Sequence, residues 1–106
     1  MRESTIVKRI RKALEERGCL VRKNHGGPMS GAAGWPDLLV IIPPLGRHVH
    51  LEVKAPGNSP TELQMSMIEK IRATGGEAYV VYSQEQALFA IYGPPTAGSG
   101  TATTSG

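Results

Sequence analysis

The stretch DLLVIIPPLGRHVHLEVK, residues 37–54, decides the fold of this chain. Two apolar runs, 37–42 and 48–54, flank two prolines and a glycine, which predicts two antiparallel strands joined by a turn. Asp37 opens the first strand, whereas Glu52 and Lys54 lie at the end of the second and point to the same face. Because the turn brings positions near Asp37 opposite Glu52 and Lys54, the hairpin gathers two carboxylates and a lysine at one end of a sheet.

The segment before this hairpin supplies a helix, a strand and a loop. Residues 3–17 carry apolar side chains at helical spacing and basic side chains mostly on the other side, and Gly18 ends this helix. Residues 19–23 are strand-like. The glycine-rich residues 24–34 form a long loop, which is more often functional than idle in a small domain.

The segment after the hairpin predicts a helix, a strand and a short helix. We expect the first helix to be capped by Ser59, with Glu62 completing a capping box, and to end at Gly75-Gly76. Its predicted buried stripe is Leu63, Met67, Ile68 and Ile71. A strand over 77–82 and a helix over 84–92 follow. The connection is long enough for a parallel crossover, so the expected fold is α/β, a mixed sheet flanked by helices in the order α-β-β-β-α-β-α.

Composition limits the other possibilities. At 106 residues there is room for one domain, which we place over residues 1–92, followed by a disordered Gly/Ser/Thr/Pro-rich tail over 93–106. The net charge of +3 favours a polyanionic partner only weakly, and five aromatics argue against base stacking on an aromatic sheet. The single cysteine, Cys19, excludes a multi-thiolate zinc site and is expected to be a buried thiol. No secretion signal or membrane span is recognised, so we expect a cytoplasmic protein.

The polar residues of the hairpin have a chemical interpretation. Glu52 and Lys54 alone could form a structural ion pair, but Asp37 beside them adds a second carboxylate. Two neighbouring carboxylates repel each other unless a cation or a proton intervenes, and hard oxygen ligands suit Mg²⁺ or Mn²⁺. Glu3 lies on the buried row of the first helix, or else simply favours the positive helix start. Gln64 lies beside the buried stripe of the second helix, where a solvent-facing role is the alternative.

These residues carry a family resemblance that spans residues 3 to about 91. In order, Gly34-Trp35-Pro36-Asp37, Glu52-Val53-Lys54 and Gln64 resemble the PD-(D/E)XK nuclease core, a restriction-endonuclease-like fold. Further segments resemble the stand-alone VRR-NUC family specifically: Glu3-Ser4-Thr5-Ile6, the glycine-rich loop, Lys54-Ala55-Pro56-Gly57, Ser59-Pro60, and Gly75-Gly76 before Tyr79-Val80-Val81. A bare Asp…Glu-x-Lys pattern is common, whereas the full series in this order is specific.

The resemblance implies roles for the site residues. Asp37, Glu52 and the backbone carbonyl of Val53 would ligate Mg²⁺ or Mn²⁺, and Glu3 would complete the site directly or through water. Lys54 would act on the attacking water. Gln64 would steady the site or the substrate. Stand-alone members resemble dimeric enzymes that cut branched DNA, including four-way junctions, in phage or bacterial replication and repair, so a homodimer acting on DNA is expected. Because Glu3 is only the third residue, fraying of the helix start could loosen that ligand.

DNA contacts and other functions stay open at this stage. Arg22, Lys23, His25 and Arg47 are candidates for phosphate contacts, and each could equally be an ordinary solvated basic residue. His48 and His50 share a strand face with Glu52, where packing competes with a metal role; for Trp35, packing of the loop competes with a DNA contact. The alternatives to the expected nuclease are a PD-(D/E)XK endonuclease with another substrate, a catalytically inactive nucleic-acid-binding module, and a small assembly protein with an ion-pair network.

Overall fold

The computed structural model describes residues 1–24 and 33–95, and its elements follow the predicted order. They are α1 (Glu3–Glu16), β1 (Leu20–Lys23), β2 (Leu38–Ile42), β3 (Arg47–Val53), α2 (Glu62–Ala73), β4 (Glu77–Val81) and α3 (Gln84–Tyr92). Each element matches a predicted one to within one or two residues at its ends. The predictions for His25, for most of the glycine-rich loop and for residues 96–106 of the tail lie outside the described residues.

The four strands form one mixed sheet in the order β1-β2-β3-β4. The predicted hairpin is confirmed: β2 and β3 pair antiparallel, with Leu38 opposite Leu51 and Ile42 opposite Arg47. Gly46 in its turn has a φ of +74°, a conformation that glycine adopts without steric cost. The predicted crossover is confirmed as well, because β3 and β4 are parallel and α2 connects them. The mixed α/β fold predicted from the sequence is therefore correct.

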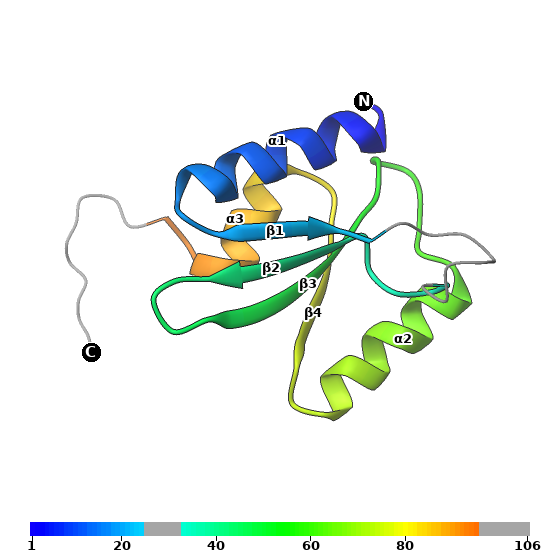
Figure 1. Cartoon of the computed structure of the whole chain (residues 1–106). Coiled ribbons are helices and arrows are strands. Elements are labelled where there is room, and N and C mark those ends of the chain that lie inside the picture. Colours follow the sequence, from blue (N-terminus) through cyan, green and yellow to red (C-terminus); the bar gives the residue numbers. More distant parts are fainter. Residues whose placement is uncertain (25–32, 96–106) are drawn as a thin grey trace.

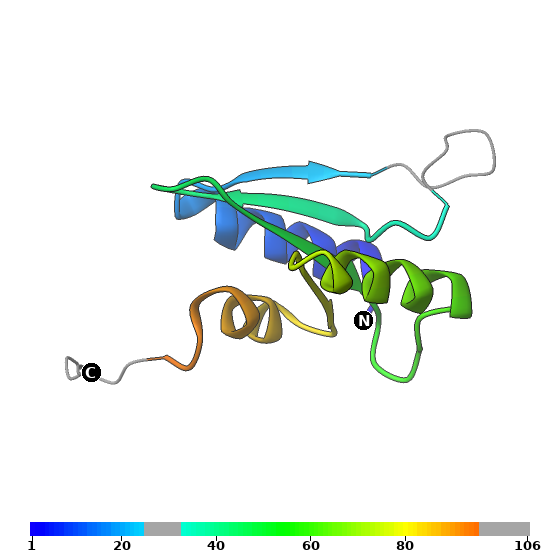
Figure 2. The same cartoon turned by 90° about the horizontal axis from the view of Figure 1, so that it is seen from below.

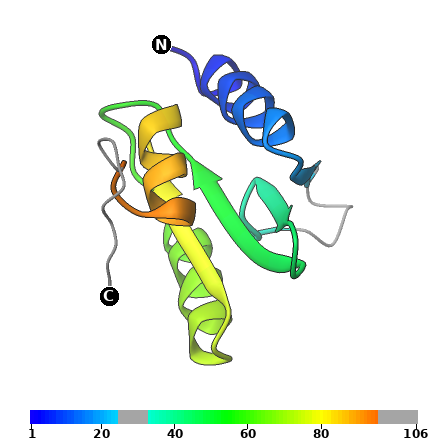
Figure 3. The ribbon, with the colours of Figure 1, turned by 90° about the vertical axis from the view of Figure 1, so that its left-hand side faces the viewer.

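The main core lies between the sheet and the pair α1 and α3. All five apolar residues on the predicted buried side of α1 are buried: Ile6, Val7, Ile10, Ala13 and Leu14. They pack with alternate residues of the two central strands, among them Val40 and Leu51. Figure 3 shows α1 and α3 on one side of the strands and α2 on the other. The period of two in the strands and of 3.6 in the helix accounts for this layer.

Helix α2 covers only part of the second face of the sheet. Its buried residues Ile68 and Ile71 pack with Ala78 of β4, in a cluster separate from the main core. Seen from below, α2 leaves β1 and β2 uncovered on this side (Figure 2). Leu20, on this face of β1, is accordingly 69% exposed. Within residues 1–24 and 33–95, helix α2 therefore packs on this face mainly over β4.

The start of α2 differs from the sequence prediction. The N-cap is Thr61 and the partner in the capping box is Gln64, instead of the predicted Ser59 and Glu62. Ser59 with Glu62 and Thr61 with Gln64 both satisfy the same four-residue pattern, and the helix begins at the later pair. Leu63, predicted to be buried, is 56% exposed and lies beside Gly34 of the loop rather than against the sheet.

Several chain segments that are distant in sequence meet at one end of the sheet. The start of β2 and the end of β3 lie together there, and the first turn of α1 contacts the chain just after β3. The first turn of α2 lies lower on the same side of the molecule (Figure 1). At the other end, Cys19 is buried as predicted, and its Sγ lies 3.3 Å from the hydroxyl of Tyr92. No described helix combines the length and apolar character that crossing a membrane requires.

Candidate active site

Asp37 and Glu52 lie side by side because of the register of the hairpin. Leu38 pairs with Leu51. Asp37, which precedes Leu38, and Glu52, which follows Leu51, therefore come to the same level. Residues directly opposite each other in an antiparallel pair point to the same face. For Asp37 and Glu52 this is the face that α2 covers in part, opposite the main core. The expectation that the two carboxylates share one face and one end of the sheet is confirmed.

Backbone contacts hold Asp37 in place. Its Oδ2 accepts a hydrogen bond of 2.9 Å from the backbone N–H of Val53, and its carbonyl oxygen accepts one of 2.7 Å from the backbone N–H of Asn24. The side chain of Asn24 also donates to the carbonyl oxygen of Pro36, at 2.7 Å. The carboxylate of Asp37 is therefore held by the end of β3, and its backbone is held by the residue that follows β1. Sequence reasoning missed Asn24; the only signal was a small amide at the junction of a strand and a loop.

Glu52 is the buried charged residue of the described chain, with 1% of its surface exposed. Its Oε2 lies 3.6 Å from Nζ of Lys54, whose side chain is 13% exposed, and its Oε1 is buried without a hydrogen-bond partner. Burial raises the pKa of Glu52 to about 7, the negative charge of Asp37 adds to the increase, and Lys54 opposes it. A buried ionised oxygen without a partner is costly, so near neutral pH the site favours a proton or a cation.

The donor set fits a hard divalent cation. Two adjacent carboxylates, one with an unpartnered buried oxygen, offer the oxygen ligands that Mg²⁺ and Mn²⁺ take. The N–H of Val53 points toward Asp37, and because the N–H and C=O of a strand residue lie on the same side, its carbonyl does too. No group of three His, Cys, Asp or Glu side chains suited to a metal occurs within the described ranges. The remaining ligands would be that carbonyl, water and substrate phosphate.

Glu3 contacts the residue that follows Lys54, whereas Gln64 makes its contacts within the cap of α2. Oε2 of Glu3 accepts hydrogen bonds from the backbone N–H of Ala55, at 3.3 Å, and from Nδ2 of Asn58, at 3.2 Å. Glu3 thus joins α1 to the turn that follows Lys54. Oε1 of Gln64 accepts from the backbone N–H of Thr61, at 2.9 Å, as part of the helix cap. The roles of Glu3 as ligand and of Gln64 at the site stay predictions.

The basic residues proposed for DNA contacts divide into two kinds. Arg22 and Lys23 are exposed on the edge strand β1. Arg47 instead donates to both carboxylate oxygens of Glu77, at 2.6 and 2.5 Å, and to the carbonyl oxygen of Ile91. It lies about 17 Å from Glu52 along β3 at the usual rise per residue. Its guanidinium therefore ties β3 to β4 and α3. The phosphate contacts of Arg22, Lys23 and Arg47 stay predictions.

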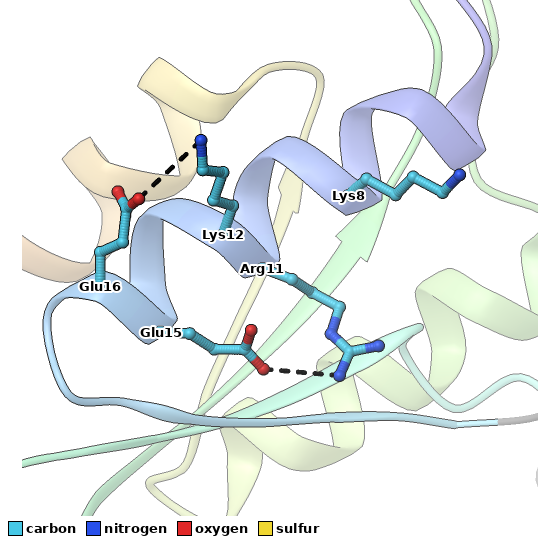
Figure 4. A pocket seen from close by; sticks show the side chains of 5 residues that line it. All are labelled: Lys8, Arg11, Lys12, Glu15 and Glu16. Atoms are coloured by element: carbon cyan, nitrogen blue, oxygen red, sulfur yellow. Dashed lines mark hydrogen bonds and ion pairs between the residues drawn. The ribbon is translucent and has the colours of Figure 1, made fainter.

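A hollow on α1 is a separate surface. Figure 4 shows it lined by Lys8, Arg11, Lys12, Glu15 and Glu16. Arg11 pairs with Glu15 at 3.4 Å and Lys12 with Glu16 at 3.9 Å, and all four side chains are well exposed. Ion pairs four residues apart on an exposed helix contribute little to stability or specificity. This hollow is a solvated charged face of α1 and not part of the candidate active site.

Comparison with known proteins identifies the family of this chain. The model of the family described as the VRR-NUC domain matches residues 4–85, which include Asp37, Glu52 and Lys54. A solved structure described as a VRR-NUC domain is 34% identical in sequence and superposes with a TM-score of 0.71. The match covers 85% of this chain and 96% of that one. No curated protein matches the sequence significantly.

Proposed function

Because this chain belongs to the VRR-NUC domain family, a family of nuclease domains, we propose that it is a divalent-metal-dependent DNA endonuclease. The observation that carries the proposal is the pairing of Asp37 with the buried Glu52, next to Lys54, on one face of the sheet. An inactive binding module would gain nothing from an unpartnered buried carboxylate oxygen, which costs free energy of folding.

The arrangement suits hydrolysis of a phosphodiester bond, in which water attacks phosphorus, one P–O bond breaks and the leaving oxygen gains a proton. Asp37, Glu52 and the carbonyl of Val53 would hold Mg²⁺ or Mn²⁺. When bound, this ion supplies positive charge to the phosphate and lowers the pKa of water. Lys54, held 3.6 Å from Glu52, would orient the attacking water or a phosphate oxygen. Glu3 and Gln64 would support the site from the starts of α1 and α2.

We further propose branched DNA, such as a four-way junction, as the substrate and a homodimer as the active form. One chain carries one such carboxylate pair, so cutting two strands of a junction symmetrically needs two copies. The edge strand β4 and helix α3 offer a surface for a second copy. An apolar groove of about 970 Å³ runs there, and Phe89 is 58% exposed beside it.

Cleavage assays test the proposal directly. Labelled four-way junction, flap, single-stranded and linear duplex DNA are incubated with Mg²⁺, Mn²⁺ or a chelator. We expect metal-dependent cutting with preference for the junction by the wild type, loss of cutting by Lys54→Ala, and full activity of Lys12→Ala, a matched exposed lysine on α1. Light scattering of the protein alone gives its oligomeric state. Folded, metal-bound protein that cuts none of the four substrates would refute the nuclease.

Two other functions remain as alternatives with distinct outcomes. A PD-(D/E)XK endonuclease with another substrate shares the site, and would cut flaps or linear duplex better than the junction. An inactive DNA-binding module would bind DNA but show no metal-dependent product. The pairing of Asp37 with the buried Glu52 favours the enzyme, because a binding module has no need of this costly buried charge. A metal that binds only the folded state should raise the melting temperature.

A further inference from the structure

A second hollow opens between the sheet and α2, next to the candidate active site. It has a volume of about 410 Å³. The sheet side contributes Trp35, His48 and His50, and α2 contributes Met67, Lys70 and Ile71. Its walls are mostly apolar and carry one aromatic ring pair, with the Trp35 and His50 ring centroids 5.8 Å apart and tilted by 46°. The nuclease reaction as proposed leaves this hollow without a role.

Trp35 is exposed yet fixed at both sides. Gly34 before it has a φ of +83°, and a Cβ at that position would lie 2.8 Å from Cγ of Leu63, so the chain requires glycine there. Pro36 after it is fully buried and accepts the hydrogen bond from Asn24. The indole itself is 41% exposed. A large exposed aromatic on a constrained backbone is pre-organised to stack on a ligand, because little freedom is lost on binding.

Two lining residues of the hollow lie close to the carboxylate pair, although neither carboxylate lines it. Trp35 precedes Asp37 by two residues. His50 precedes Glu52 by two residues on the same face of β3, which places it about 7 Å away at the usual strand rise. A phosphate bound at Asp37 and Glu52 would therefore have its neighbouring nucleotide within reach of Trp35.

The charges around the hollow fit a nucleotide. Lys70 of α2 lines it and carries the positive charge that a phosphate needs. Glu77 also reaches it, but its carboxylate is neutralised by Arg47, which lowers the pKa of Glu77. The five aromatics of the chain are too few for a stacking sheet, whereas one fixed indole is enough for a single base.

We propose that this hollow binds one unpaired nucleobase adjacent to the cleaved phosphate, stacked on Trp35, with a flanking phosphate at Lys70. The proposal rests on the proposed nuclease function. It explains selectivity for branched DNA physically: a base that is already unpaired near a branch point enters at little cost, whereas a base in linear duplex must first leave its stack. Trp35 is then a specificity-determining residue of the site.

The test separates binding from cleavage. In the Lys54→Ala background, DNA affinity is measured for linear duplex and for a junction or flap with 2-aminopurine at the first unpaired position. We expect Trp35→Ala to weaken binding of the branched DNA by about 5- to 140-fold, the range of one base–aromatic stack, and to leave duplex binding unchanged. It should also abolish the change in 2-aminopurine fluorescence. Trp35→Phe should retain most of both signals, and Leu45→Ala, at the exposed hairpin turn, should change neither.

Each outcome decides something. If a folded Trp35→Ala protein binds duplex and branched DNA with equally reduced affinity, the base pocket is overturned. It is also overturned if the substitution dissociates a dimer, because the hollow would then be an interface between two copies of the chain. If Trp35→Ala fails to fold, Trp35→Phe and the fluorescence of wild-type complexes decide instead. Absence of cleavage by wild type with the fluorescence signal intact would refute the nuclease and keep the pocket. Cleavage by the wild type without a change in 2-aminopurine fluorescence would refute the pocket and keep the nuclease.

Discussion

The backbone N–H of Val53 donates to Oδ2 of Asp37 across 2.9 Å, which joins the start of β2 to the end of β3 at the level of the two carboxylates. This bond gives Asp37 a structural role beside the proposed metal-binding one. A substitution can separate the two roles. An asparagine at position 37 keeps an oxygen that can accept this hydrogen bond, but it loses the negative charge of the carboxylate.

We predict that Asp37→Asn folds with nearly wild-type stability in chelator but is no longer stabilised by Mn²⁺. Asp37→Ala should lose about 1–3 kcal/mol of stability, because the N–H of Val53 is left without its partner. Thermal unfolding of both variants with and without metal is the measurement. Equal stability of the two variants in chelator would show that the hydrogen bond contributes nothing.

Lys54→Ala should reduce the rate of cleavage by about 10²- to 10³-fold, the effect typical of removing one charged group from a transition state. Metal binding should persist, because Lys54 is not a proposed ligand and only opposes the increase in the pKa of Glu52. Single-turnover cleavage with saturating metal measures the first effect, and the metal-induced shift in melting temperature measures the second. A variant that retains most of the rate would exclude Lys54 from the chemistry.

The stability of metal-free protein should fall as the pH rises. The pKa of Glu52 is raised from 4.5 to about 7 by burial and by Asp37, so the folded state holds a proton that the unfolded state has released. The contribution of Glu52 is thus most favourable below pH 4.5 and is lost as the pH rises through 7. We expect the melting temperature in chelator to decrease from pH 5 to pH 8, and Mg²⁺ to restore it at pH 8. Glu52→Gln should remove both effects; a pH dependence that survives this substitution belongs to another group.

Arg47 and Lys23 should behave differently when truncated. Arg47→Ala is expected to cost about 1–2 kcal/mol of stability, because it loses a half-exposed ion pair with Glu77 and a hydrogen bond to the carbonyl of Ile91. We expect it to leave the salt dependence of DNA binding unchanged. Lys23→Ala should leave stability unchanged and reduce the slope of log affinity against log salt by about one. Unfolding and DNA titrations at several salt concentrations distinguish the two, and an altered slope for Arg47→Ala would show that Arg47 contacts DNA as well as Glu77.

The sequence alone determined the hairpin and the carboxylate pair. The two apolar runs 37–42 and 48–54, with a turn of two prolines and a glycine between them, predict the antiparallel pairing of β2 and β3. That pairing brings Asp37 beside Glu52 and Lys54 onto the same face. The apolar side of α1 was equally determined, because a period of 3.6 is a local property of the chain.

Only the tertiary structure decided which partners the remaining polar groups find. Arg47 pairs with Glu77, thirty residues later, and Asn24 donates to Pro36 across the loop. Thr61 rather than Ser59 caps α2, although both fit the pattern. The ring contact between Trp35 and His50 likewise joins two separate segments of the chain. Residue spacing encodes which face a side chain takes within one element, whereas these contacts depend on distances between elements, which the packing of the whole chain sets.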